Sequence, residues 1–278
     1  MNSFEKQLVD KLKNMDNEGF TLLFEHYYKK IYNLAFRMCG NKEDAEDIMQ
    51  KTFVQAYTNI SGFNGESSIY TWLYAITKNL CLRLLEKRKK SSFSSLDELL
   101  KVAQSIENPD SFTIFEKQYY ISQVKEGCLL GLLRCLSFYQ RIAFILNVLL
   151  EIKVKDVAVI ISKTEPATRL LVHRAKQNIR SFLCKNCSLY DTRNPCHCEN
   201  LIEFSLKQGW IKKMPDKSFI SGSDKVIPAI ESEINSLKKI ALLYRSLEDK
   251  QYSDTMLQSI QKELHKHTYK IFYDKKVK

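Results

Sequence analysis

Apolar side chains recur at intervals of three and four residues through most of the chain, which is the period of an amphipathic helix. The first such stripe ends at Gly40, a residue suited to the left-handed position that follows many helices. Its members are Phe20, Leu23, Phe24, Tyr27, Ile31, Leu34, Ala35 and Met38. Asn41 can cap a second helix, and a third helix is predicted over residues 69–89, after a polar loop at residues 63–68. These elements predict an all-α bundle over residues 1–90.

A second helical module is predicted over residues 119–183. A short apolar helix at residues 154–161 is followed by a turn at residues 162–164 and by a longer helix at residues 165–183, which is rich in Arg and Lys. Thr164 is a natural N-cap for the longer helix. Two helices joined by so short a turn are typical of a helix-turn-helix, although amphipathic helix pairs that bind no DNA are also common.

The remaining segments are predicted to be a linker, a cysteine-containing segment and a helical extension. Residues 91–118 form the linker, residues 184–198 hold the cysteines, and residues 199–278 form the extension. Two apolar stripes in the extension must pack on this chain, on a partner or on a second copy. They consist of Ile230, Ile234, Leu237, Ile240, Ala241, Tyr244 and Leu247, and of Met256, Leu257, Ile260 and Leu264. The predicted fold class is all-α: two small helical domains joined by a linker, with a helical C-terminal extension.

Composition narrows the classes of function. The 278 residues include only 8 Gly and 5 Pro, too few turn residues for a β-sandwich or barrel. Neither the GxGxxG nor the GxxxxGKS/T phosphate-binding pattern occurs, which excludes two large classes of nucleotide-dependent enzyme. No apolar run approaches the roughly 18 residues of a membrane span, and the first ten residues lack the apolar region of a secretory signal. We therefore expect a cytoplasmic protein with no membrane contact.

Charge is distributed unevenly along the chain, whose formal net charge is +11. Residues 41–50 carry a net charge of −3 and residues 91–118 carry −3, whereas residues 83–90 carry +4 and residues 151–185 carry +5. A basic run on one helix is usually a solvated face. Two basic runs that each end a helical segment indicate instead two modules that contact a polyanion.

Several motifs of the first module resemble conserved region 2 of bacterial RNA polymerase sigma factors, in particular the extracytoplasmic-function (ECF) group. They are Asp44-Ala-Glu-Asp-Ile48, Gln50-Lys-Thr-Phe53, Phe63-Asn-Gly-Glu-Ser-Ser68 and Thr71-Trp-Leu-Tyr74, with Ile76 and Asn79. The helix-turn-helix, with Val172-His-Arg-Ala175, is similar to region 4 of the same group. The two resemblances stand in the family's order, with a linker between them.

The resemblance implies that an acidic helix docks on a coiled coil of the polymerase's largest subunit. The matching positions are Asp44, Asp47, Ile48, Gln50 and Phe53. From the residues alone, a solvated helix start for the two carboxylates and a core position for the two apolar side chains are equally open.

The resemblance further implies that the loop and third helix open the −10 promoter element and hold a flipped base. Aromatic rings can stack on an unpaired base, Asn amides can hydrogen-bond a base edge, and basic side chains can bind phosphates. The matching positions are Phe63, Asn64, Glu66, Ser67, Ser68, Tyr70, Trp72, Tyr74 and Asn79, with Arg83, Lys87 and Arg88 on phosphates. Burial of Trp72 in the core is the alternative.

In region 4, the resemblance places one face of the longer helix on the −35 element. The matching positions are Thr164, Arg169, Leu170, His173, Arg174 and Lys176. The chain departs from the family's pattern at Ser162 and Pro166, where glycines are usual, and at Leu170, where a small polar residue is usual. Leu170 can contact a thymine methyl group but cannot hydrogen-bond a base.

Cysteines cluster directly behind the longer helix. Cys184 and Cys187 form a CxxC pair, and Cys196 and Cys198 follow, with His197 between them as an alternative ligand. Four sulfur ligands at such spacings suit tetrahedral zinc, whereas a thiol–disulfide switch is the main competing interpretation. The other cysteines, Cys39, Cys81, Cys128 and Cys135, are predicted to be core residues.

These features together predict a sigma factor without catalytic residues, whose core function requires no cofactor. A structural or sensory zinc ion is left open. Its expected partners are core RNA polymerase and promoter DNA, both duplex and melted, and an anti-sigma factor is left open. The alternative is a free-standing helix-turn-helix regulator with a zinc-stabilised dimerisation tail. An enzyme with Cys184 and His197 as a nucleophile pair is disfavoured because no orienting acid is recognisable.

Overall fold

The structure, a computed structural model, is helical throughout its described part. That part comprises residues 3–14, 16–88, 100–101 and 112–214 and the single positions 244, 258, 260 and 262. Apart from an isolated bridge between Cys187 and Cys196, every regular element in these ranges is a helix or helical turn, which confirms the predicted all-α class. The chain divides into two compact units. Within the described ranges, no helix is both long enough and apolar enough to cross a membrane.

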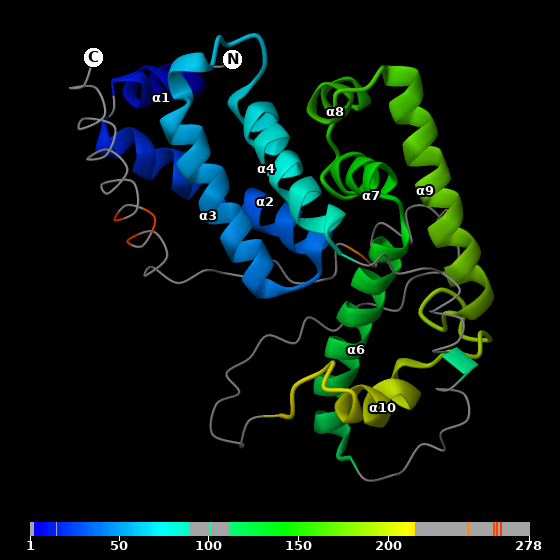
Figure 1. The fold of residues 1–278 in the computed structure, drawn as a ribbon. Helices are drawn as coiled ribbons and strands as arrows, with labels where there is room; N and C mark the ends of the chain where they lie inside the picture. Colours follow the sequence, from blue (N-terminus) through cyan, green and yellow to red (C-terminus); the bar gives the residue numbers. More distant parts are fainter. Residues whose placement is uncertain are drawn as a thin grey trace. The chain divides into compact units, whose positions relative to one another are not determined.

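The first unit is a helical bundle. It contains α1 (Ser3–Lys13), α2 (Asn17–Cys39), α3 (Lys42–Thr58), the short 3-10 helix η1 (Ile60–Gly62), α4 (Ile69–Glu86) and α8 (Val154–Ile161). Helices α2, α3 and α4 pack on one another, and α8 packs on α4 (Figure 1). The ends of the helices follow local sequence signals. Gly40 is left-handed, with φ 81°, and the Asn41 side chain accepts the Asp44 N–H at 2.8 Å, so both predicted caps are confirmed.

The second unit is built on a long helix, α6. Its elements are α6 (Ile114–Cys135), α7 (Phe138–Phe144), the π-helical turn η2 (Ile145–Leu149), α9 (Glu165–Asn186), the 3-10 helix η3 (Cys198–Leu201) and α10 (Ile202–Lys207). Helix α6 begins inside the segment expected as a linker, because Thr113 and Glu116 form a capping box. The Glu116 carboxylate accepts the Thr113 N–H at 2.8 Å, and the Thr113 hydroxyl accepts the Glu116 N–H at 3.3 Å.

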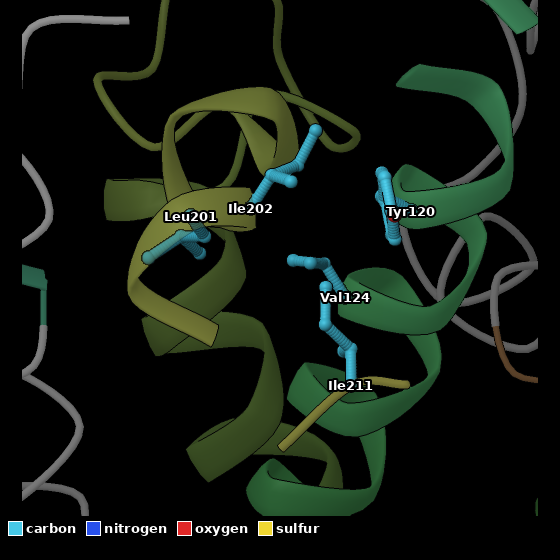
Figure 2. Packing of buried hydrophobic residues seen from close by; sticks show 5 residues of the cluster. All are labelled: Tyr120, Val124, Leu201, Ile202 and Ile211. Atoms are coloured by element: carbon cyan, nitrogen blue, oxygen red, sulfur yellow. The ribbon is translucent and has the colours of Figure 1, made fainter. Parts of the chain in front are cut away.

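The first part of the predicted extension packs on α6. Figure 2 shows Tyr120 and Val124 of α6 facing Ile202 and Ile211, which form one apolar cluster with Leu201. Hydrogen bonds reinforce the contact: the Gln123 side chain donates to the Lys212 carbonyl at 3.2 Å and accepts the Lys212 N–H at 3.0 Å. Residues 198–214 therefore belong to the fold of the second unit.

Most of the two predicted apolar stripes lies outside the described residues. Tyr244 and Ile260, one from each stripe, are described and fully buried, as the stripes predict. The Tyr244 hydroxyl donates to the Leu129 carbonyl at 3.1 Å, and its ring meets that of Phe144 edge-on at 5.7 Å. A residue far along the extension is thus anchored on α6 and α7.

Candidate nucleic-acid interface

The acidic helix α3 presents only some of the predicted polymerase-binding residues on its surface. Ile48 and Phe53 are 2% and 0% exposed, so both side chains lie in the core, as their helical period allows. Asp47 is exposed and pairs with Lys51 at 2.7 Å. Asp47, Gln50 and Lys51 line an open groove bounded on the other side by Leu80 of α4. The accessible part of the predicted contact is therefore the exposed Asp47 and the half-buried Gln50.

Asp44 is held by two neighbouring side chains. Arg88 donates from both terminal nitrogens, one of them at 2.9 Å, and the Asn41 amide donates to the same carboxylate. Partial burial opposes ionisation of the carboxylate, but the hydrogen bonds from Arg88 and Asn41 prevail and lower the pKa of Asp44 below its usual value. Asp44 was predicted to bind polymerase and Arg88 to bind phosphate. In this structure the two side chains form an ion pair with each other.

The aromatic residues predicted to meet the opened DNA strand divide into buried and accessible rings. Phe63 and Tyr74 are 3% and 4% exposed, so neither offers a ring face to a base in this conformation. Trp72 is half-buried and packs its ring on Phe63 with centroids 5.2 Å apart. Tyr70 is also half-buried and donates its hydroxyl to Asp156 at 3.3 Å. Among these aromatic residues, Trp72 and Tyr70 retain accessible surface.

Polar residues around the accessible rings form the rest of this surface. Asn64 and Glu66 are exposed in the loop, where the Asn64 side chain accepts the Glu66 N–H at 3.3 Å. Ser67 is half-buried, and Ser68 caps α4 by accepting the Thr71 N–H at 3.4 Å. The predicted amide and phosphate ligands on α4 and just beyond its end are all exposed: Asn79, Arg83 and Lys87.

The predicted DNA-reading helix α9 is amphipathic. Its buried positions are Thr168, Val172, Ala175, Ile179, Phe182 and Leu183. Of the predicted contacts, Lys176 is half-buried and the others are exposed: Thr164, Arg169, Leu170, His173 and Arg174. Leu170 is 48% exposed, so its side chain is accessible to a partner. The turn before α9 contains Ser162 with φ 55°, the left-handed conformation for which the family's usual glycine is suited.

The cysteine cluster differs in membership from the predicted one. A cavity of about 20 Å³ is lined by Cys187, Cys196 and Cys198 and also by Cys128 of α6, which was predicted to be a plain core residue. Cys184 does not line this cavity and neither does His197, and both are half-buried. Within the described residues, no group of three or more Cys, His, Asp and Glu side chains is arranged to hold a metal ion. The zinc site predicted from the sequence, with Cys184, Cys187, Cys196 and Cys198 as ligands, therefore stays a prediction.

Comparison with known proteins identifies the first module. Residues 23–91 match the family model of sigma-70 region 2, a segment that runs from α2 through α3 and η1 to just beyond α4. The acidic face of α3 and the loop before α4 lie inside this match. This part of the chain is therefore similar in sequence to sigma-70 region 2.

The chain is also similar to individual RNA polymerase sigma factors. The ECF RNA polymerase sigma factor SigW of Bacillus subtilis (strain 168) is 39% identical over 84 residues, which are 30% of this chain and 45% of that protein. RNA polymerase sigma factor YlaC of the same strain is 27% identical over 165 residues, 59% of this chain and 91% of that protein. The solved structure of CnrH in complex with the cytosolic domain of CnrY aligns with a TM-score of 0.47 and 16% identity, over 65% of this chain and 97% of that one. The chain thus covers less than half of SigW and most of YlaC.

Proposed function

We propose that this chain is an ECF-type sigma factor that binds core RNA polymerase and directs promoter-specific initiation of transcription. The observation that carries the proposal is the sigma-70 region 2 match over residues 23–91, within which Asp47, Asn64 and Asn79 are exposed. The proposal places the protein in the cytoplasm with the polymerase, and it assigns no bond-making chemistry and no required cofactor to the chain itself.

The first module supplies two surfaces for this function. Asp47 and Gln50 on α3 line a groove that is available to the polymerase, and the half-buried Trp72 and the exposed Asn79 on α4 are available to the opened strand. A half-buried Trp suits base stacking because Phe63 packs against its ring while part of its surface stays accessible. Base–aromatic stacking of this kind is worth about 1–3 kcal/mol.

The second module supplies the −35 contact in this proposal. Arg169, His173 and Arg174 are spaced to share the exposed side of α9, opposite its buried stripe. Arginine can bind guanine with two hydrogen bonds, and the exposed Leu170 can contact a thymine methyl group.

The decisive experiment tests strand opening apart from polymerase binding. The full chain should co-purify with core polymerase and start transcripts from a promoter library. Trp72→Ala and Asn79→Ala should keep polymerase binding but slow open-complex formation on duplex promoters, measured by permanganate reactivity, and both should recover on a pre-opened bubble. Gln7→Ala, at an exposed position of α1 outside residues 23–91, is the control on the duplex template. Equal loss on both templates would rule out a role in melting.

The alternative function, a free-standing helix-turn-helix regulator, makes a different prediction. Such a protein binds duplex DNA without polymerase and has no use for an accessible Trp72 beside a polar loop. Specific footprints from the isolated chain, unaffected by Trp72→Ala and by added polymerase, would favour the regulator over the sigma factor.

A further inference from the structure

We propose that Cys128, Cys187, Cys196 and Cys198 form a four-thiolate site for one Zn²⁺ ion, which fastens α6 to the segment that follows α9. The site is independent of the proposed function, since none of these residues lies in region 2 or on the exposed face of α9.

The backbone brings three of these cysteines to one place. Cys187 and Cys196 form an isolated parallel bridge, in which the Ser188 N–H donates to the Cys196 carbonyl at 3.1 Å and the Cys196 N–H donates to the Asn186 carbonyl at 2.9 Å. His197 is extended, with φ −97° and ψ 134°. Side chains on either side of an extended residue point the same way, so Cys196 and Cys198 share one side while His197 faces the other.

The fourth cysteine comes from α6. Tyr120, Val124 and Cys128 follow one another at intervals of four residues and therefore share one face of that helix. Tyr120 and Val124 pack against Leu201, Ile202 and Ile211, and Cys196 and Cys198 pack against the same cluster. The packing of residues 198–214 on α6 therefore places these two cysteines near Cys128. The four cysteines then line the same cavity of about 20 Å³. A cavity of this size has room for about one water-sized sphere, and hence for a single ion.

A hydrogen-bonded turn and a basic side chain surround these thiols. The Tyr190 and Asp191 N–H groups donate to the Cys187 carbonyl at 3.0 and 3.1 Å, which fixes the turn that carries Cys187. Lys125 of α6 also lines the cavity. Four thiolates around Zn²⁺ carry a net charge of −2, which a neighbouring ammonium partly offsets.

A metal site fits these thiols better than a redox switch. Redox-sensing cysteines are solvent-accessible. Here Cys187 is buried, Cys128, Cys196 and Cys198 are half-buried, and all four line one small cavity. Zinc removes the protons of its thiol ligands and releases them to solvent. Because the side chains are not yet arranged around an ion, binding requires rotation about the Cα–Cβ bonds of the cysteines.

The test uses the full chain and measures metal binding directly. Metal analysis should find one zinc per chain, and replacement by Co²⁺ should give the visible bands of tetrahedral sulfur coordination. Cys128→Ser should weaken Co²⁺ and Zn²⁺ binding by at least about 100-fold, since even outer-shell partners of a metal account for 10–100-fold. Cys184→Ser and Cys135→Ser, on α9 and α6, are matched controls that should bind as the native chain does.

Thiol labelling of the native chain keeps the test valid if Cys128→Ser fails to fold. With zinc bound, N-ethylmaleimide followed by mass spectrometry should label Cys184 and spare the four proposed ligands, and chelation should expose them. Protection of Cys184 with labelling of Cys128 would overturn the ligand set. A metal-free chain that takes up no Zn²⁺ or Co²⁺ would overturn the site, and a Cys187–Cys196 disulfide in that chain would identify a redox pair instead.

Discussion

Asn194 closes the end of α9, and its removal should loosen the turn that carries Cys187 and Cys196. Its side-chain Nδ2 lies 3.1 Å from the Leu183 carbonyl oxygen, 3.1 Å from that of Cys184 and 3.0 Å from that of Cys187. Carbonyl groups in the last turn of a helix lack a full set of intrahelical partners, so a side-chain donor there is valuable. Asn194→Ala leaves these acceptors without that donor.

The magnitude follows from the number of donors. One amide NH₂ group has two hydrogens for the three carbonyls, so it contributes about two full hydrogen bonds, each worth about 0.5–1.5 kcal/mol net. The free energy of local opening should fall by about 1–3 kcal/mol. Since 1.4 kcal/mol is a factor of ten, amide exchange in this turn should accelerate by roughly 5- to 150-fold.

The assay is native-state hydrogen exchange at the Ser188 and Cys196 amides, whose bonds of 3.1 and 2.9 Å form the bridge. Asn194→Asp should be worse than Asn194→Ala above pH 5, because a carboxylate repels the carbonyl groups and the negative end of the helix dipole. Asn186→Ala is the control: its side chain donates to one carbonyl, that of Phe182, at 3.1 Å. Unchanged exchange at Ser188 and Cys196 in Asn194→Ala, or the same change as in Asn186→Ala, would refute the reasoning.

Three further outcomes are expected. In a randomised −35 selection, Arg174→Ala should cost about 1–3 kcal/mol at one base position and relax preference there, whereas Lys176→Ala should weaken all sites alike and reduce the salt slope by about one; identical behaviour would contradict the division of roles. Because the pKa of Asp44 is lower in the folded state, its pairing with Arg88 stabilises the fold at pH values above the unfolded-state pKa of about 3.9. This stabilisation is lost as the pH falls through the lower folded-state pKa. In urea unfolding, Asp44→Asn should therefore cost about 0.5–1 kcal/mol at pH 7 and progressively less below pH 4; a deficit independent of pH would exclude this ion pair as its cause. Ile202→Ala should lower the free energy of unfolding by about 2–4 kcal/mol, and Trp210→Ala, whose side chain is 58% exposed, by much less; equal effects would mean that residues 198–214 are not part of the core.

Helix ends were the most predictable feature of this chain because their causes are local. Gly40 ends α2 and Asn41 caps α3 through backbone conformation and hydrogen bonds to nearby residues, and both caps are where the sequence predicts them. The start of α6 was readable by the same logic, since Thr113 and Glu116 have the spacing of a capping box, but the pattern lay inside a segment assigned to the linker.

Surface assignments within residues 23–91 were less predictable, because residues of the matching motifs also lie in the core. Ile48, Phe53, Phe63 and Tyr74 carry the family resemblance, and all four are buried. A helical period shows which residues share a face, but it does not show whether that face meets the core or a partner. Only the packing of α2, α3 and α4 decides this, and it leaves Asp47, Gln50, Trp72 and Asn79 accessible.

Cys128 shows how far spacing can carry a site prediction. Cys184 to Cys198 are close in sequence, so sequence reasoning grouped them, yet Cys184 sits outside the cavity that the other three line. Cys128 could have been found from its position four residues after Val124, because this spacing places both on the face of α6 that contacts Leu201 and Ile202. The apolar start of the extension and the cysteines therefore pack on the same face of α6. Anything that displaces residues 198–214 from Tyr120 and Val124 must also separate Cys196 and Cys198 from Cys128, so packing and metal binding at this helix are coupled.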